Sequence, residues 1–149
     1  MVVVFISDTD SVSSYEEVIR LAGQPLVKAE RILPEYSQAC IDREVDFPTG
    51  LQLSNGIGLA MPHGHADLVK EDSISILRLK EPVEFGLMED KSKKVSVSLV
   101  FHLALSSGQE HLQVLRKVIR LFQNENFITQ CLTDDVDAVA SLVEKELSN

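Results

Sequence analysis

The sequence predicts an α/β fold in which one mixed central β-sheet is sandwiched by helices. Short apolar runs indicate strands, and amphipathic stretches near both ends of the chain indicate helices. Elements mixed in this order pack with the helices on the faces of the sheet. The length of 149 residues, with no linker, internal repeat or low-complexity segment, favours a single domain over residues 1–149.

One strand and one helix are expected first. The run 2–6 is short, apolar and rich in β-branched residues, which is typical of a strand. Ser13 and Ser14 are each followed three residues later by a glutamate, the pattern of a capping box at a helix start. Gly23 and Pro25 are expected to end this helix.

A second helix is expected over residues 34–45, because proline suits a first helical turn. Its apolar stripe contains Tyr36, Ala39 and Cys40, and Arg43 extends that stripe by a further three residues. An arginine on an inward stripe meets an anion, or it complements the helix dipole in the last turn. Both interpretations of Arg43 stay open at this point.

Strands and turns dominate the middle of the chain, and helices follow. Residues 57–61 are short and apolar, residues 73–79 come close to an alternating pattern, and residues 95–105 form a longer run. Because this last run is almost wholly apolar towards its end, it indicates a strand buried on both faces. Helical spacing of apolar residues then predicts helices over 108–123 and 136–147.

The charge balance excludes some partners. Fourteen Lys and Arg against 23 Asp and Glu give a net charge of −9, which repels nucleic acid and anionic membrane surfaces. The longest uninterrupted apolar run, 2–6, is far below the roughly 20 residues that cross a bilayer, and the sequence shows no signal peptide. We therefore expect a cytoplasmic protein with no membrane insertion. Cys40 and Cys131 lack a C-x-x-C partner, which excludes a four-cysteine zinc site and favours two buried free thiols.

Two histidines are candidates for chemistry. His63 lies between Pro62 and Gly64, directly after the expected strand 57–61, so its side chain is firmly held and can still be exposed. This suits a nucleophile or a ligand, although a turn histidine without a role fits as well. His111 falls in the first turn of an expected helix, where free N–H groups favour an anion. A surface histidine is the alternative there.

The two other histidines carry weaker signals. His63 and His65 on one side of a strand, with Asp67 near, would be a zinc site with three ligands, but a turn at Gly64 breaks that alternation. A metal-dependent hydrolase is thus the least favoured alternative, and no metal or other cofactor is expected. His102 lies within an apolar strand, which favours a histidine of the core over a ligand.

Several motifs together resemble a known family. They are Arg43-Glu44, Phe47-Pro48-Thr49-Gly50, the segment 56–64 ending in Met61-Pro62-His63-Gly64, and Glu110-His111-Leu112 ahead of an amphipathic helix. This set is similar to the enzyme IIA domain of the fructose/mannitol class of the bacterial phosphoenolpyruvate-dependent sugar phosphotransferase system. The Pro-Thr-Gly stretch resembles the galactitol-type branch most and the mannitol-type domains next.

The resemblance implies a phosphotransferase component with a phosphohistidine intermediate. His63 matches the histidine that this family phosphorylates, and His111 and Arg43 match its second histidine and its arginine. The implied donor is the histidine-containing phosphocarrier protein, the implied acceptor is a cysteine of an enzyme IIB, and the implied cargo is a sugar or polyol, galactitol-like. The alternative is a regulatory enzyme IIA-like module that signals by its phosphorylation state.

A protein that meets two successive partners at one histidine needs exposed apolar surface around it. Leu59 and Met61 beside His63 in sequence, and Leu112 beside His111, are the expected rim or floor of that surface.

Overall fold

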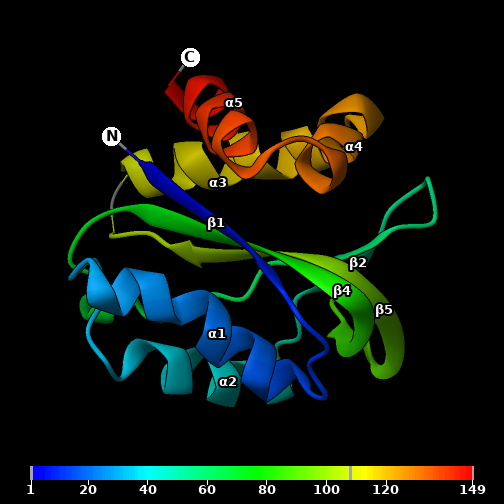
Figure 1. Cartoon of the computed structure of the whole chain (residues 1–149). Coiled ribbons are helices and arrows are strands. Elements are labelled where there is room, and N and C mark those ends of the chain that lie inside the picture. The colour runs from blue at the N-terminus through cyan, green and yellow to red at the C-terminus, as the bar shows by residue number, and fades with distance from the viewer. Residues whose placement is uncertain (1, 108, 149) are drawn as a thin grey trace.

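A mixed five-stranded sheet forms the centre of the computed structural model, which describes residues 2–107 and 109–148 (Figure 1). The strands are β1 (Val3–Thr9), β2 (Gly50–Gln52), β3 (Gly58–Ala60), β4 (Ser73–Leu87) and β5 (Asp90–Ala104). β4 pairs in parallel with β1 and antiparallel with β5, and β5 pairs in parallel with β3. β2 pairs antiparallel with β3 and touches the far end of β4.

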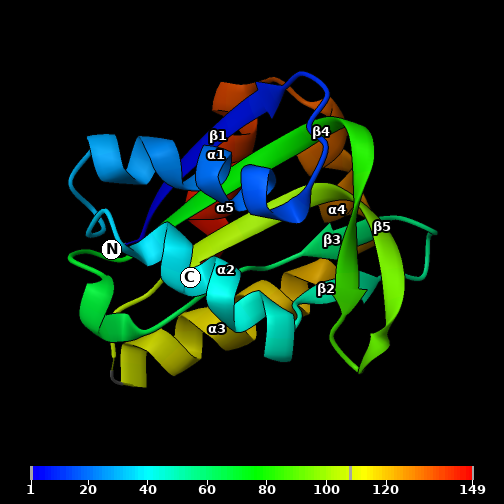
Figure 2. The same cartoon turned by 90° about the horizontal axis from the view of Figure 1, so that it is seen from below.

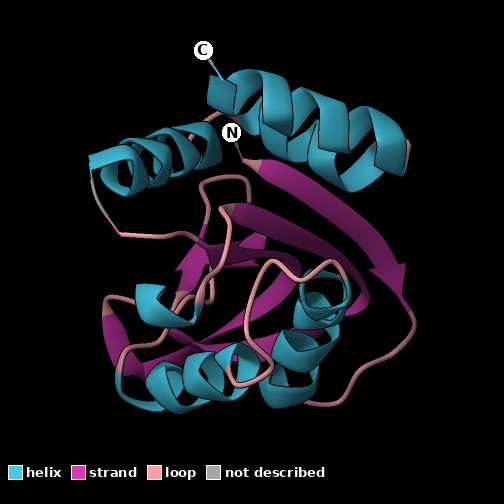
Figure 3. Ribbon diagram, turned by 90° about the vertical axis from the view of Figure 1, so that its left-hand side faces the viewer, coloured by secondary structure: helices cyan, strands magenta, loops and turns pink. Residues whose placement is uncertain are grey.

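Helices cover both faces of this sheet, as the sequence predicts. α1 (Tyr15–Lys28) and α2 (Tyr36–Asp46) form one layer, and α3 (Gln109–Phe122), α4 (Glu125–Thr133) and α5 (Val136–Ser148) form the other. Figures 1 and 3 show the strands between the two layers. A short 3-10 helix, Ala66–Leu68, follows β3. No helix within the described residues is long and apolar enough to span a membrane.

Alternation along the central strands gives each layer its own core. On β4, Ile74 and Ile76 pack into the core under α3, α4 and α5, whereas Leu77 and Leu79 pack into the core under α1 and α2. β5 does the same, and from Leu99 onward every residue of this strand is buried. The expectation of a strand buried on both faces is therefore confirmed, because helices lie on both sides of it.

The prediction that Gly23 and Pro25 end the first helix is wrong. α1 continues through both residues to Lys28, with Leu26 fully buried. Gly23 serves a close approach between helices, since a Cβ there would lie 2.2 Å from the Ser37 Oγ of α2. The left-handed position that usually signals a helix end is taken by Glu30, with φ of 58°.

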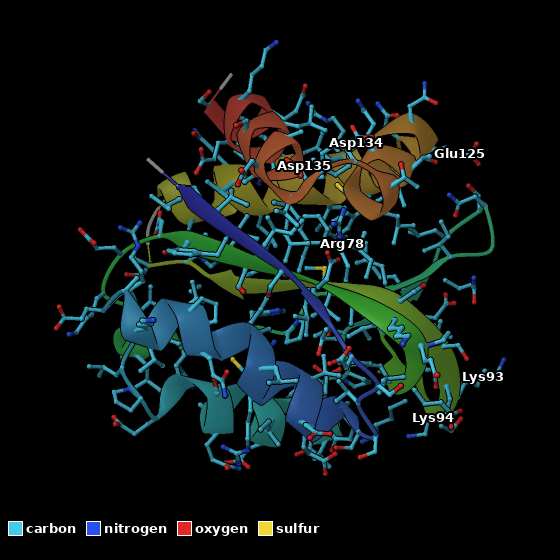
Figure 4. The ribbon with its side chains drawn as sticks, in the orientation of Figure 1. Arg78, Lys93, Lys94, Glu125, Asp134 and Asp135 are labelled. Carbon is cyan, nitrogen blue, oxygen red and sulfur yellow. The ribbon has the colours of Figure 1, made fainter. Side chains whose placement is uncertain are left out.

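Helix α4 is absent from the sequence prediction. Its start is capped by Asn124, whose side-chain oxygen accepts the Phe127 N–H at 3.1 Å, and Phe127, Ile128 and Cys131 fill its buried face. Arg78 of β4 fixes the end of α4, because its guanidinium donates to the backbone carbonyl oxygens of Cys131 and Asp134. Figure 4 shows Arg78 pointing from the sheet towards the junction of α4 and α5.

The hairpin of β4 and β5 is longer than predicted. The expected strand 73–79 extends to Leu87, across an irregularity between Arg78 and Val83. Figure 2 shows the end of the hairpin reaching past α2, and Lys93 and Lys94 lie towards that end (Figure 4). This length brings Leu87 against Gly50 of β2, which links the hairpin to the segment that precedes the predicted site.

Both cysteines are free and buried, as expected. Burial raises the pKa of each thiol, Cys40 and Cys131, to about 12, which keeps both thiols protonated and unreactive.

Candidate functional site

His63 lies three residues after the end of β3, where the sequence analysis expects it. Its side chain is half-buried, and its Nδ1 lies 2.9 Å from the carbonyl oxygen of Met61. A carbonyl oxygen only accepts, so Nδ1 carries the ring proton and donates it. The Nε2 lone pair is then free for reaction in the neutral imidazole.

The backbone around His63 is held by buried side chains from α2 and β5. The Pro62 carbonyl oxygen accepts the Leu103 N–H at 2.9 Å and the His102 Nδ1–H at 3.2 Å. The Gly64 N–H donates to the Tyr36 hydroxyl at 3.0 Å, and that hydroxyl donates to the Leu103 carbonyl at 2.6 Å. These bonds fix the direction of the loop on both sides of His63.

The approach of α2 leaves little room for a side chain at position 64. A Cβ on Gly64 would lie 3.2 Å from Cys40 Sγ and 3.4 Å from a ring carbon of Tyr36. A Cβ at this position would require the loop or these two side chains to shift by a few tenths of an ångström, next to the bond between the Gly64 N–H and the Tyr36 hydroxyl.

The environment keeps His63 neutral. Burial lowers the pKa of the His63 imidazole from its usual value near 6.5, and the positive charges of Arg43 and His111 lower it further. The hydrogen bond to the Met61 carbonyl opposes this shift. A neutral imidazole with a free Nε2 is the form that attacks an electrophile.

Arg43 is exposed, which corrects the prediction that it lies on the inward stripe of its helix. The buried face of α2 consists of Tyr36, Ser37, Cys40, Ile41 and Glu44, so that Arg43 stands beside this stripe. Its guanidinium stacks over the Phe47 ring, 5.0 Å from the ring centroid. Among the residues that the structure describes, Arg43 forms no ion pair, and its donors are open to a ligand.

His111 lies in the first turn of α3, as predicted, and is half-buried. Its Nδ1 is shielded from solvent and has no hydrogen-bond partner within the described part of the chain. An unpaired buried nitrogen costs free energy unless a ligand satisfies it. The sequence predicts that this helix begins at Gly108, and that residue lies outside the described residues.

A hollow of about 670 Å³ brings the three predicted residues together. Arg43 from α2, His63 from the loop after β3 and His111 from α3 line it, with His65 and Ser107 at its wall. One arginine, one free imidazole nitrogen and one unpaired nitrogen at a helix start make a site for an oxyanion such as a phosphoryl group.

A second hollow of about 510 Å³ shares Arg43 and His63 with the first. Phe47, Met88 and Ile119 line it, and each is a large apolar residue with at least two-fifths of its surface exposed. This apolar surface beside His63 suits a protein partner that docks and leaves again.

The sequence predicts apolar surface around His63 from Leu59, Met61 and Leu112, and the structure confirms only part of this set. Leu112 is half exposed and lines the first hollow, as expected. Met61 is buried and forms part of the second hollow, whereas Leu59 is fully buried in the core and contributes nothing to the surface. The alternation of β3 turns Leu59 into the sheet core, and the sequence alone does not show that inward direction.

His65 and His102 have separate places. His65 is exposed at the wall of the first hollow, and the described residues contain no cluster of three His, Cys, Asp or Glu placed to hold a metal ion. His102 is fully buried, as predicted for a core histidine, and its ring stacks on Tyr36 with centroids 5.6 Å apart. Burial lowers the pKa of His102 to about 4.

The sequence analysis misses the roles of Tyr36, Glu44 and Thr49. Glu44 is buried, and both of its carboxylate oxygens accept hydrogen bonds from Thr49. Burial raises the pKa of the Glu44 carboxyl to about 7, against the bonds from Thr49 that lower it. The signal in the sequence is the Arg43-Glu44 pair followed by Pro48-Thr49-Gly50, which resembles a family motif but does not show that Glu44 and Thr49 bond to each other.

Residues 3–146 match the sequence family described as "Phosphoenolpyruvate-dependent sugar phosphotransferase system, EIIA 2". Over 132 residues the chain is 33% identical to the mannitol-specific EIICBA component of the phosphotransferase system of Escherichia coli K12, a match of 86% of this chain. The chain spans 19% of the length of that relative. Over 117 residues it is 31% identical to the galactitol-specific EIIA component of Escherichia coli K12, 78% of this chain and 77% of that protein.

The fold is similar to that of a solved complex of enzyme IIAMTL and phosphorylated enzyme IIBMTL from Escherichia coli. The TM-score is 0.70 and the identity 31%, over 95% of this chain and 94% of the matched chain.

Proposed function

Because this chain belongs to the phosphotransferase-system EIIA 2 family, whose domains carry a phosphohistidine, we propose that His63 is the residue phosphorylated here. The observation that supports this most is the hollow in which His63 meets Arg43 and His111. Three segments far apart in sequence supply a nucleophilic nitrogen, a planar fork of donors and an unpaired nitrogen around one space.

The chemistry is an exchange of one phosphorus–nitrogen bond for another. The Nε2 lone pair of His63 forms the new bond to phosphorus, while the bond to the donor histidine breaks and its electron pair stays on the donor nitrogen. The His63 Nδ1 keeps its proton, which the Met61 carbonyl oxygen accepts throughout. The protein then has to align the group and stabilise its three equatorial oxygens.

Arg43 and His111 supply that stabilisation. The guanidinium of Arg43 offers paired donors that match phosphoryl oxygens, and its stacking on Phe47 limits its freedom before the group arrives. His111, as the tautomer with its proton on Nδ1, donates a further hydrogen bond, aided by the N-terminal turn of α3.

The proposed partners are the histidine-containing phosphocarrier protein as donor and an enzyme IIB as acceptor. The similar solved structure is a complex with a phosphorylated enzyme IIB, which supports the second partner. The exposed apolar residues of the second hollow, beside His63, are the proposed contact surface.

The proposed cargo is a hexitol, galactitol-like. The Pro48-Thr49-Gly50 stretch favours galactitol, while the relatives of this chain carry mannitol and galactitol in their names. A comparison of two acceptors tests this proposal. Phosphorylated protein should pass its group to a galactitol-type enzyme IIB faster than to a mannitol-type one, and equal or reversed rates would contradict the galactitol assignment.

Labelling with phosphoenolpyruvate tests the phosphorylated residue. The protein is incubated with phosphoenolpyruvate, enzyme I and the histidine-containing phosphocarrier protein, and the acid-labile phosphate is mapped. We expect the phosphate on His63, no labelling of His63→Ala, and full labelling of His65→Ala as the matched control. Normal labelling of a folded His63→Ala variant would overturn the proposal.

The phosphorylated protein from this labelling, mixed with an enzyme IIB, distinguishes a phosphocarrier from the regulatory alternative. A carrier loses its phosphate to an enzyme IIB cysteine within the assay, whereas a regulatory module keeps it. Retention of the phosphate with both types of enzyme IIB would favour the regulatory module.

A further inference from the structure

A buried carboxylate lies behind the site and outside the hollow. Glu44, the neighbour of Arg43 in sequence, is only 5% exposed and forms no ion pair within the described part of the chain. A buried carboxylate costs free energy unless hydrogen bonds satisfy it. Among the described residues, Thr49 alone supplies its hydrogen bonds, from the backbone N–H to Oε2 at 2.6 Å and from the hydroxyl to Oε1 at 3.0 Å and Oε2 at 3.2 Å.

The chain of hydrogen bonds continues from Thr49 to Met61. The hydroxyl of Thr49 has one proton, which it donates in the hydrogen bond to Glu44, so the hydroxyl oxygen can only accept a further bond. The Met61 N–H donates to this oxygen at 3.3 Å. The same N–H also donates to the Thr49 carbonyl oxygen, at 3.3 Å, so the hydrogen bond is bifurcated.

Met61 then connects this chain to the reacting histidine. Its N–H points to Thr49, and its carbonyl oxygen accepts the proton of His63 Nδ1 at 2.9 Å. With both its N–H and its C=O fixed, the backbone of Met61 has little freedom to rotate. The Met61 carbonyl is what holds the imidazole with Nδ1 protonated and Nε2 unprotonated.

We propose that Glu44 is a positioning residue for phosphoryl transfer, acting through Thr49 and the Met61 backbone on the orientation and tautomer of His63. It touches neither the phosphoryl group nor the reacting nitrogen. This inference rests on the proposed function of His63. It explains why the chain buries a carboxylate where an apolar residue would fill the same space without the cost of desolvation.

A matched pair of substitutions at Thr49 tests the series of hydrogen bonds from Glu44 to His63. Thr49→Val keeps the shape of the side chain and removes the hydroxyl, whereas Thr49→Ser keeps the hydroxyl. The first readout is the ¹⁵N chemical shifts of the His63 ring nitrogens in unphosphorylated protein at about pH 8, above the pKa of about 7 of Glu44, so that this side chain is mostly a carboxylate. We expect one tautomer, with the proton on Nδ1, in the parent and in Thr49→Ser, and a mixture of tautomers in Thr49→Val.

The second readout is the single-turnover rate of phosphoryl transfer from the histidine-containing phosphocarrier protein. Thr49→Val should be slower by about tenfold, the scale of one lost hydrogen bond, and Thr49→Ser should keep the parent rate. Glu44→Gln should behave as Thr49→Val does, because an amide cannot accept two bonds on two oxygens. Should Glu44→Gln not fold, the Thr49 pair still decides the question.

A single parent-like tautomer in folded Thr49→Val, or an unchanged transfer rate, would overturn the role of Glu44. Failure of the proposed function looks different, because the parent protein itself would then take no phosphate on His63. The tautomer measurement uses unphosphorylated protein and does not depend on that result.

Discussion

Arg43 keeps its guanidinium beside His63 without an ion pair among the described residues, and His111, which lines the same hollow, keeps a buried nitrogen without a partner among them. Stabilising donors of this kind act on the transition state, in which charge spreads over the phosphoryl oxygens. Their contribution is therefore expected in the rate of transfer more than in the stability of the fold.

Replacement of either residue by alanine should slow phosphoryl transfer by between about 10 and 1000 fold, the range for one lost stabilising donor. Single-turnover transfer from the histidine-containing phosphocarrier protein measures it. Arg43→Lys should recover only part of the loss, because an ammonium cannot grip two oxygens at once. A parent-like rate in a folded Arg43→Ala or His111→Ala variant would refute the role of that residue.

His102 makes the stability of the fold depend on pH. Burial lowers the pKa of this imidazole to about 4, below its usual value near 6.5, so the folded protein resists taking the proton that the unfolded chain accepts. The stabilising effect is complete above pH 6.5 and is lost as the pH falls towards 4. Over that window it corresponds to about 3 kcal/mol of unfolding free energy.

His102→Phe should remove this contribution, so that the variant gains stability relative to the parent as the pH falls from 6.5 towards 4, since the new ring still stacks on Tyr36 but cannot be protonated. Urea unfolding at several pH values from about 4 to about 7 measures the free energy of unfolding of both proteins over this window. His65→Gln, a change at an exposed histidine, serves as the control and should keep the parent slope. If the free energy of unfolding changed with pH in the same way in His102→Phe and in the parent, His102 would not be the group whose protonation destabilises the fold.

Among the elements, α4 depends on its cap and on its neighbours. The helix is short, and isolated helices of this length are marginal in water. Asn124 satisfies a free N–H at its start, and Arg78 holds its last carbonyl groups from the sheet. α4 lines neither of the two hollows at His63.

Asn124→Ala should therefore lower the free energy of unfolding by about 1 kcal/mol and leave phosphoryl transfer unchanged. Chemical denaturation measures the first quantity and the transfer assay the second. Asn124→Ser restores a side-chain acceptor and should recover most of the stability. A loss of transfer in Asn124→Ala would show that α4 contributes to the site.

At the scale of the whole molecule, the proposed relay requires both partners to reach one nitrogen. In that relay the donor and the acceptor each bring a reactive side chain to His63 Nε2, so we expect their footprints to overlap on the surface formed by the two hollows. Transient partners need a small contact, under about 1,200 Å² of total buried area. Phe47, Met88 and Ile119 are exposed apolar residues at the second hollow, beside His63.

NMR titration should show the two partners shifting one shared set of resonances and displacing each other. Phe47→Ser should weaken both interactions, because this side chain lines the second hollow and supports Arg43. Val45→Ser is the matched control, since Val45 is as exposed as Phe47 and lies two residues before it, in the last turn of α2, but lines neither hollow. Two separate patches of shifted resonances, or a stable ternary complex, would contradict a relay through one histidine.

Local patterns in the sequence determine a large part of this protein. The spacing of apolar residues predicts α2, α3 and α5 to within about two residues, because each helix has to bury one continuous face. The Pro62-His63-Gly64 turn after a short apolar run predicts a histidine held at the end of a strand. The family and its fold follow from motifs that are each local in sequence.

Tertiary structure alone decides the rest, because it depends on contacts between segments far apart in the chain. α1 passes through Gly23 since α2 packs closely there, and α4 forms because the sheet and Arg78 support it. Glu44 lies on the buried face of α2 and Arg43 does not. Packing against the rest of the molecule determines which face of this helix is buried, and the periodicity of the sequence does not. The convergence of positions 43, 63 and 111, and the link from Glu44 to His63, exist only once the sheet is assembled, since no local spacing encodes a distance between strands and helices that meet in space.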